Sequence, residues 1–328
     1  MNSNKLKDST VLVTGGAGFV GSYIVEKLLP FEPAKIFIID NMIRGSHRNM
    51  EHFINHSLVE FYEDDIRNGQ LMDDLMSQSD YCFHLAALRI NRCAENQPEA
   101  FDVMVKATFD LIELARKHQI KKLIYSSTAS VYGLSQHFPT PETDNSYDNK
   151  TFYGAAKVFG ESILRSYHDM HGLNYVALRY FNIYGPRMDT EGKYTEVMIK
   201  WLDCIRDDRA PLIFGDGSTS MDFVYVEDVA DANIAALLND VTDEVFNIGC
   251  QVETSLKELL ELLLKINDSD LQPEHRPENT VNPVSRRLAD ISKAKEMLNF
   301  EPKVSLEEGL KQLSKWYLEL HKEKTEHF

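Results

Sequence analysis

The stretch that decides the fold lies near the N-terminus, where residues 11–21 read VLVTGGAGFVG. An apolar run, a glycine-rich turn and an amphipathic stretch in this order predict a buried strand, a tight turn and a helix start. Gly15 permits the turn, Gly18 lets the backbone approach a pyrophosphate, and Gly21 lets the helix pack on the sheet. Amides at the helix N-terminus favour an anion. We therefore expect a dinucleotide phosphate to bind at Gly15, Gly18, Phe19 and Val20.

An acidic residue follows this turn at the distance that a dinucleotide site requires. The apolar run 35–39 ends at Asp40, about 20 residues beyond the last glycine of the turn. A carboxylate there accepts a hydrogen bond from a ribose 2′-hydroxyl and repels a 2′-phosphate. NAD is therefore expected rather than NADP, with Asp40 and Asn41 in the site. Arg44 lies close enough to keep NADP open as an alternative.

Strand-like and helical patterns alternate through the first half of the chain. Further apolar runs at 59–62, 81–84 and 123–125 each precede small or polar residues, and residues 98–118 form a long helical pattern. Near-continuous apolar strands separated by helices predict a parallel sheet that is buried on both faces. We expect a Rossmann-type, doubly wound α/β fold that binds its ligand at the carboxyl ends of the strands.

The second half has a different character and predicts a smaller, mainly helical C-terminal substrate lobe. Capping boxes at Ser255 with Glu258 and at Ser305 with Glu308 each open a helical pattern, and residues 270–283 suggest an ordered loop or a short hairpin. The expected boundaries are a cofactor domain over 1–182 with a return segment over about 222–249, and a substrate lobe over 183–221 and 250–328.

Composition excludes several classes of function. The 328 residues carry a formal net charge of −16, which repels polyanions and makes nucleic acid an improbable partner. The four cysteines are scattered and suggest neither disulfides nor a metal site, which fits a reducing compartment. No apolar run reaches the roughly 18 residues of a membrane span. We expect a cytoplasmic protein with no bound metal and no membrane insertion.

A tyrosine and a lysine lie four residues apart in the segment YGAAK, residues 153–157. On a helix Tyr153 and Lys157 share one face. A nearby ammonium group favours the phenolate and lowers the pKa of the tyrosine toward a working value. Such a tyrosine can remove a proton from an alcohol while a hydride leaves the same carbon. The pair alone is a weak signal, but it accompanies a dinucleotide-type glycine turn and a Ser/Thr-rich strand end.

Together these segments resemble the extended short-chain dehydrogenases of the nucleotide-sugar epimerase/dehydratase family. The matching pieces follow family order across almost the whole chain: TGGAGFVG (14–21), Asp40, Asp65-Ile66, LAA (85–87), SSTASVYG (126–133), YGAAK (153–157), RYFNIYGPR (179–187), GDGSTSMDFVYVEDV (215–229) and LADISKAK (288–295). The resemblance implies NAD as cofactor, a nucleotide-diphosphate sugar as ligand and a homodimer built from helices at about 98–118 and 151–172. Within the family, the resemblance is strongest to the UDP-hexose 4-epimerases.

The resemblance also implies roles for particular residues. Thr128, Tyr153 and Lys157 correspond to the catalytic residues. Further cofactor contacts are implied for Asp65, Ile66, Leu85, Ala86, Ala87, Arg89, Ser126, Tyr153, Lys157 and Tyr180. Substrate contacts are implied for Ser127, Thr128, Asn182, Leu212, Phe214 and Arg287. For Ser126 and Ser127, capping of the strand end is an equally good interpretation.

The residues after Thr128 bear on the reaction. Members that act as 4,6-dehydratases carry an acid pair there, and decarboxylating members usually carry an acid near this point, whereas this chain has Ala129 and Ser130. Neither side chain performs acid–base work at neutral pH. The simplest remaining chemistry is epimerisation at C4 through a 4-keto sugar, with a UDP-hexose as the best candidate. A nucleotide-4-ketosugar reductase and a non-enzymatic NAD-binding sensor are the alternatives.

One departure from the family pattern concerns the phosphate-binding arginine. The family usually has an arginine where this chain has Met221, and a methionine cannot bind the ligand diphosphate. We expect Arg287, or Arg286 beside it, to supply the cation. The alternative is that both are surface arginines in a charged turn.

Overall fold

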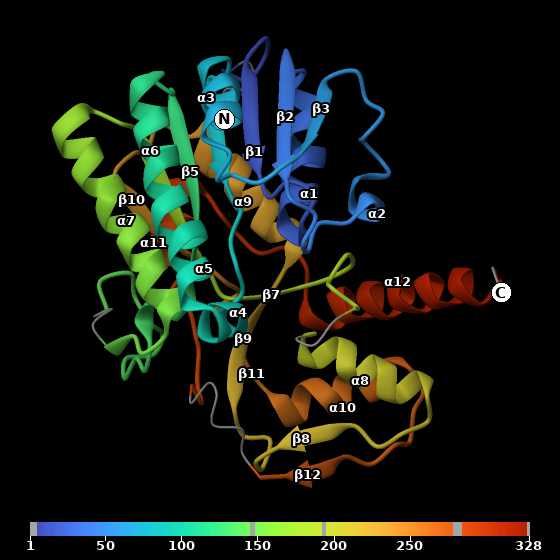
Figure 1. Ribbon diagram of the computed structural model, residues 1–328. Coiled ribbons are helices and arrows are strands. Elements are labelled where there is room, and N and C mark those ends of the chain that lie inside the picture. Colours follow the sequence, from blue (N-terminus) through green and yellow to red (C-terminus); the bar gives the residue numbers. More distant parts are fainter. Residues whose placement is uncertain (1–4, 145–147, 192–194, 278–283, 327–328) are drawn as a thin grey trace.

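The computed structural model describes residues 5–144, 148–191, 195–277 and 284–326. A seven-stranded sheet forms its centre, in the order β10-β6-β5-β4-β1-β2-β3 (Figure 1). All neighbouring pairs are parallel. The strands are β1 (Thr10–Thr14), β2 (Lys35–Asp40), β3 (Val59–Glu63), β4 (Tyr81–His84), β5 (Lys122–Thr128), β6 (Tyr175–Tyr180) and β10 (Glu244–Ile248). The expected α/β fold is thus confirmed, and strand order reverses between β1 and β4, where such sheets bind ligands.

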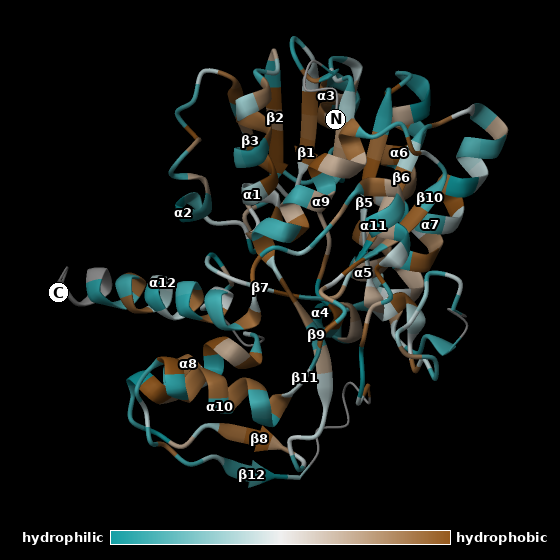
Figure 2. Cartoon of the chain, turned by 180° about the vertical axis from the view of Figure 1, so that it is seen from behind, coloured by the Kyte–Doolittle hydropathy of each residue, from teal (hydrophilic) through white to brown (hydrophobic). Residues whose placement is uncertain are grey.

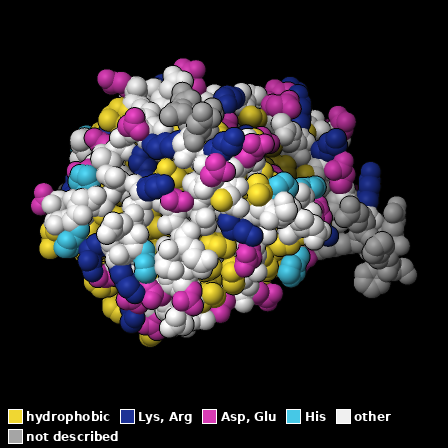
Figure 3. All heavy atoms as spheres, turned by 90° about the horizontal axis from the view of Figure 1, so that it is seen from above, with side chains coloured by type: hydrophobic (Ala, Val, Ile, Leu, Met, Phe, Trp, Pro, Cys, Tyr) yellow, Lys and Arg dark blue, Asp and Glu magenta, His cyan; other side chains and the backbone are white. Residues whose placement is uncertain are grey.

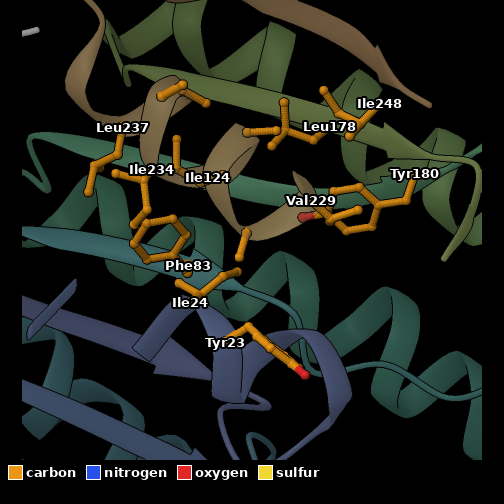
Figure 4. Close-up of a cluster of buried hydrophobic side chains, with 14 of the residues drawn as sticks. Tyr23, Ile24, Phe83, Ile124, Leu178, Tyr180, Val229, Ile234, Leu237 and Ile248 are labelled. Atoms are coloured by element: carbon orange, nitrogen blue, oxygen red, sulfur yellow. The ribbon is translucent and has the colours of Figure 1, made fainter. Parts of the chain in front are cut away.

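Helices cover both faces of the sheet, as the apolar strands require. One face packs against α1 (Phe19–Leu28), α9 (Val226–Leu238) and α11 (Ser292–Leu298). The other packs against α3 (Gly69–Ser77), α6 (Ala107–Lys117) and α7 (Phe152–His171). Figure 4 shows the first of these cores, where Ile24 and Ile234 reach from α1 and α9 toward Phe83 and Ile124 of the strands. Burial of each such side chain contributes about 1.5–3 kcal/mol.

The long helical pattern at 98–118 is interrupted in the structure. It forms α5 (Gln97–Phe101), a π-helical turn η3 (Asp102–Lys106) and α6. Within this turn the Met104 sulfur accepts a hydrogen bond from the backbone N–H of Leu88 at 3.1 Å. Short elements at the rim of the sheet complete this part: η2 (Leu29–Phe31), α2 (His47–Met50), α4 (Ile90–Glu95) and η4 (Ala129–Tyr132).

A smaller lobe lies beyond the carboxyl ends of the strands (Figure 1). It is built from α8 (Val197–Arg206), α10 (Leu256–Ile266) and α12 (Leu306–Glu326), with β8 (Leu212–Phe214) pairing β12 (Glu274–Arg276). A third sheet of β7 (Asn182–Tyr184), β9 (Ser220–Tyr225) and β11 (Glu253–Ser255) connects the lobe to the large sheet. The lobe has its own apolar core around Trp201, Leu260 and Leu313, and the inner faces of its helices are hydrophobic (Figure 2).

Two local expectations for the lobe have different outcomes. The capping box of α10 is present: the Ser255 hydroxyl accepts from the N–H of Glu258, whose carboxylate accepts from the N–H of Ser255. The hairpin considered for 270–283 is wrong within the described part, because β12 pairs in parallel with β8 from about sixty residues earlier. Residues 278–283 of that segment lie outside the described residues.

The surface and the helices bear on the partner classes. On the face seen in Figure 3, acidic and basic side chains are intermingled, with no continuous basic area. Within the described ranges, none of the helices combines the length and apolarity that a membrane crossing needs. The same residues contain no cluster of three or more His, Cys, Asp or Glu side chains arranged to hold a metal ion.

Candidate functional site

A cleft of about 1760 Å³ lies between the carboxyl ends of the strands and the lobe. It gathers nearly all of the residues that the sequence assigns to ligands, from segments far apart in the chain. These are Gly15, Gly18, Phe19, Val20, Asp40, Asn41, Asp65, Ile66, Leu85, Ala86, Ala87, Arg89, Ser126, Ser127, Tyr153, Lys157, Tyr180, Asn182, Leu212, Phe214 and Arg287. Thr128 does not line the cleft directly, but it contacts Tyr153 behind the cleft wall.

The glycine turn forms a close-packed cradle at the start of α1. Gly15 has a φ of +73°, and a Cβ there would lie 2.8 Å from the backbone nitrogen of Ala86. A Cβ on Gly21 would lie 2.2 Å from the carbonyl oxygen of Gly15. Gly18 caps α1 without a side-chain hydrogen bond, and the first turn holds no acidic residue. The helix N-terminus is therefore open to an anionic group, as a bound pyrophosphate requires.

Asp40 is held at the end of β2 with its carboxylate beside this cradle. It accepts hydrogen bonds from the N–H groups of Ala17 at 3.1 Å and Met42 at 3.0 Å. Burial raises the pKa of Asp40, and those backbone donors oppose the rise. Arg44 is turned toward Asp189 of the opposite wall, with 3.6 Å between nitrogen and oxygen. Arg44, the arginine that kept NADP open as an alternative, is thus paired with an acid, while Asp40 lines the cleft at the position expected for the ribose.

Asp65 and Asn41 lie together at the expected adenine end of the cleft. The guanidinium of Arg67 donates twice to Asp65, each time at 2.8 Å, and the Asn41 amide donates to it at 2.7 Å. These bonds lower the pKa of Asp65 to about 2, with the Arg67 hydrogen bond as the main cause. The loop after β3 is therefore a charged, hydrogen-bonded unit. The residues at the cradle and along β2 and β3 fit a dinucleotide.

Tyr153 and Lys157 enter the cleft from the first two turns of α7. Thr151 caps this helix by accepting from the N–H of Gly154 at 3.1 Å. The Lys157 ammonium donates to the carbonyl of Ser126 at 2.6 Å and lies 4.8 Å from the centre of the Tyr125 ring. Burial lowers the pKa of Lys157 to about 8. This lysine therefore titrates near physiological pH.

The phenol of Tyr153 is surrounded by groups that act on its ionisation in opposite directions. Burial raises its pKa, while a hydrogen bond with the Thr128 side chain and the charges of Arg44 and Arg89 lower it. Thr128 also accepts from the N–H of Ser130 at 3.1 Å, which fixes its hydroxyl. The structure thus brings Thr128, Tyr153 and Lys157 together at the carboxyl end of β5. A hydroxyl, a phenol and an ammonium so placed can transfer a proton to and from an alcohol.

The remaining strand-end hydroxyls join buried hydrogen bonds. Ser126 and Tyr180 share a bond of 2.9 Å, and the Tyr180 hydroxyl donates to Asn233 of α9 at 2.9 Å. Ser127 donates to the buried carboxylate of Glu161. Sequence reasoning missed both Asn233 and Glu161. For Glu161 a signal exists, because it follows Lys157 by one helical turn on the same face.

Arg287 lines the ligand space on the lobe side of the cleft. Arg287 donates to the carbonyl of Ala129 at 2.5 Å, lines the cleft beside Met221, and has its pKa lowered to about 10 by burial. Arg286 points away and pairs with Glu253 at 2.7 Å. Asn182 lines the same space and donates to the carbonyl of Asp222 at 3.2 Å.

His84 lies at the end of β4 beneath the cleft and has a structural environment. Its two ring nitrogens lie 2.9 Å from the hydroxyl of Thr14 and 3.1 Å from that of Thr108. Burial lowers the pKa of His84 to about 3, so the ring is neutral at physiological pH. It connects β1, β4 and α6 rather than facing the ligand.

Known proteins match this chain along nearly its full length. Residues 11–249 match the family described as the NAD dependent epimerase/dehydratase family. A UDP-glucose 4-epimerase of Mycolicibacterium smegmatis is 33% identical over 91% of this chain and 95% of its own. A UDP-N-acetyl-alpha-D-glucosaminuronate decarboxylase of Bacillus cytotoxicus is 32% identical over 94% of this chain and 98% of its own.

A solved structure repeats the fold. The UDP-N-acetylglucosamine 4-epimerase of Methanobrevibacter ruminantium, in complex with UDP-N-acetylmuramic acid, is 33% identical and superimposes with a TM-score of 0.91. The alignment covers 96% of this chain and 99% of that one. These matches, together with the glycine cradle, Asp40 and the Tyr153–Lys157 pair, establish the cofactor as NAD. The chain belongs to the NAD-dependent epimerase/dehydratase family and is an NAD-dependent enzyme that modifies nucleotide sugars.

Proposed function

We propose that the protein is a 4-epimerase that inverts C4 of a nucleotide-diphosphate sugar, with a UDP-hexose as its substrate. The observation that carries this proposal is the meeting of Thr128, Tyr153 and Lys157 beside the cradle for the cofactor. Bound NAD supplies the hydride acceptor and donor for the sugar carbon. Every other requirement of the reaction falls to side chains of the chain itself.

In the proposed reaction the Tyr153 phenolate removes the proton from the C4 hydroxyl and later returns it. The Lys157 ammonium stabilises the phenolate by its charge, and Thr128 orients the phenol by a hydrogen bond. Because the same tyrosine serves in both directions, no net proton is gained or lost by the site. The 4-keto sugar has to turn within the cleft between the two steps, and the cleft has a volume of about 1760 Å³.

Residues beyond β5 favour epimerisation over the other reactions of the family. Ala129 and Ser130 follow Thr128 in η4, and neither carries a carboxyl group. A 4,6-dehydration would need acids at this point to act on C5 and C6, and decarboxylating members usually carry an acid near it. The decarboxylase relative is 32% identical to this chain, but these two positions of the chain support the simpler reaction.

For the substrate we propose that Arg287 binds the diphosphate in place of the arginine that Met221 replaces. Its guanidinium makes a single described hydrogen bond, to a carbonyl, so a desolvated cation faces the ligand space. Asn182 contacts the same phosphates, and β8 lies along the base with Leu212 and Phe214. Ser127 still has lone pairs with which to accept from a sugar hydroxyl while it donates to Glu161.

We further propose that the chain forms a homodimer through α5, α6 and α7, which lie side by side (Figure 1). Large apolar side chains stand exposed on these helices: Phe101 is 51% exposed, Phe109 37% and Met170 67%. Sedimentation velocity tests this surface directly. A monomer for the wild-type chain, or a dimer that survives Phe101→Glu, would contradict it.

The reaction is tested by nuclear magnetic resonance with UDP-, GDP-, dTDP- and CDP-sugars as substrates. An epimerase yields the C4 epimer with no change of absorbance at 340 nm over many turnovers, whereas a ketosugar reductase consumes reduced cofactor. Tyr153→Phe should abolish turnover and leave NAD bound. If the wild-type holoenzyme converts no nucleotide sugar, the proposed function is contradicted. If Tyr153→Phe turns over at the wild-type rate, the proposed mechanism is contradicted.

A further inference from the structure

A buried ion pair lies directly behind the catalytic residues. Arg179 of β6 donates twice to Glu161 of α7, at 2.9 and 2.6 Å, and both side chains are less than one tenth exposed. Ser127 of β5 donates its hydroxyl to the same carboxylate. Ser127 and Arg179 are opposite each other in the β5–β6 register. One carboxylate therefore connects two neighbouring strands to the helix that carries Tyr153 and Lys157.

The location of this junction relates it to the reaction. Ser127 stands between Ser126, whose carbonyl accepts from Lys157, and Thr128, whose hydroxyl meets Tyr153. Both contacts join β5 to α7, and Glu161 adds a third between them and one turn further along the helix. Three polar contacts along one seam fix both the translation and the rotation of α7 against the end of β5.

The carboxylate also supplies charge to the catalytic lysine. Burial lowers the pKa of Lys157, while the negative charge of Glu161 raises it. The other titratable groups facing Lys157 are Cys93 of α4, the neutral His84 of β4 and Tyr153 one turn before it, and the Tyr125 ring of β5 lies beneath it. Glu161 and Cys93 are the two whose charges raise the lysine pKa, and burial raises the pKa of the Cys93 thiol to about 11. The Glu161 carboxylate, paired with Arg179, is therefore the source of the negative charge that acts on Lys157.

We propose that Glu161 is a positioning residue for the reaction, which holds the Ser126–Thr128 strand end against α7 and keeps Lys157 charged beneath Tyr153. This inference rests on the proposed function only for its kinetic readout. Arg179 belongs to the same device, because it fixes both oxygens of the Glu161 carboxylate and is itself held by the Tyr132 hydroxyl at 2.9 Å and the Glu142 carbonyl at 3.0 Å.

The test is Glu161→Gln in the holoenzyme, which keeps the shape and an acceptor for Ser127 but removes the charge. We expect kcat to fall roughly tenfold at pH 8, while KM changes less than about twofold. In the pH profile of kcat, the decline on the alkaline side should begin about one pH unit lower than in the wild type. Glu142→Gln is the matched control. Glu142 lies in the same polar network and accepts from the N–H of Asn247 at 2.8 Å, but it has no contact with Ser127. Its pH profile should match the wild type.

Two further measurements keep the inference falsifiable. If Glu161→Gln fails to fold because Arg179 is left unpaired, the double variant Glu161→Met/Arg179→Met removes both charges together. It should fold, retain NAD and show the same shift. If the wild type converts no nucleotide sugar, nuclear magnetic resonance of ε-13C-labelled lysine measures the titration midpoint of Lys157 without substrate. The proposal is overturned if the pH profile of kcat of the Glu161 variant declines at the same alkaline pH as that of the wild type, or if the Lys157 titration midpoint is the same in both.

Discussion

The cleft has two walls that are built in different ways. The sheet wall is formed by the strand ends of the large sheet with the starts of α1 and α7, and the lobe wall by the lobe that contains α8, α10 and α12. On the sheet wall, Asp40, Asp65 and Lys157 each have two or more described partners. On the lobe wall, Arg287 makes one described hydrogen bond, and Phe214 is 47% exposed. The sheet wall therefore holds its groups in place before a ligand arrives. The lobe wall presents groups whose interactions remain to be completed by the ligand.

This difference matches the two tasks that the proposed epimerisation sets. Hydride and proton transfer need groups fixed within a fraction of an ångström, which buried hydrogen bonds on rigid strands provide. A sugar that turns over between two steps needs room, and its diphosphate needs a cation that has not already been neutralised. The comparison predicts that changes on the sheet wall reduce kcat, whereas changes on the lobe wall reduce substrate affinity.

The largest effect is expected for Lys157→Met on the sheet wall. Loss of the ammonium removes the charge that stabilises the Tyr153 phenolate, so kcat should fall by about 10³ while the fold and the bound NAD remain. Single-turnover absorbance at 340 nm with saturating sugar nucleotide measures this step. A decrease confined to KM would show that the lysine serves binding and would break the division between the walls.

The next largest effect is expected for Arg287→Ala on the lobe wall. A charge-assisted hydrogen bond to phosphate is stronger than a neutral one, so kcat/KM should fall about 100-fold, equivalent to about 2.7 kcal/mol, mainly through KM. Arg286→Ala is the matched control, because Arg286 is engaged by Glu253 outside the cleft. Equal kinetics for both variants would assign the phosphate to another group.

The ligand-binding residues of the sheet wall could be predicted from the sequence because each of its motifs is local. The glycine cradle, Asp40 and the Tyr153–Lys157 pair are defined by spacings along one strand–helix unit, and the structure places all of them in the cleft. The interrupting turn at η3 could not be predicted in this way. The turn packs against α7, a contact between distant segments that a helical pattern does not record.

The lobe wall and the buried network depend on contacts between distant segments. Whether Arg286 or Arg287 faces the cleft is decided by an isolated bridge between Ser220 and Arg286, which sets the direction of each side chain. The parallel pairing of β12 with β8 likewise joins segments that no local pattern connects. Arg179 begins one family motif and Glu161 lies one helical turn beyond another, but their pairing depends on β6 and α7 lying against each other in space.

A smaller effect is expected for Asp40→Ala. Loss of the carboxylate at the ribose position should weaken NAD binding about tenfold and leave the kcat of the NAD-saturated enzyme near the wild-type value. Isothermal titration of protein freed of cofactor measures the affinity, and NADP serves as the comparison ligand. Improved NADP binding is expected, because the repulsion of the 2′-phosphate is removed. Unchanged affinity for both cofactors would place the ribose elsewhere.

The smallest effect concerns pH. Lys157 has a pKa lowered to about 8, and the proposed mechanism uses its charged form, which is lost as the pH rises through that value. Activity should therefore be halved near pH 8 and decline about tenfold per pH unit above it. Because the lysine belongs to the sheet wall, Arg287→Ala should lower the whole profile without moving this limb. If the alkaline decline of the pH–activity profile shifts in Arg287→Ala, the two walls are coupled, and proton transfer is not separate from phosphate binding.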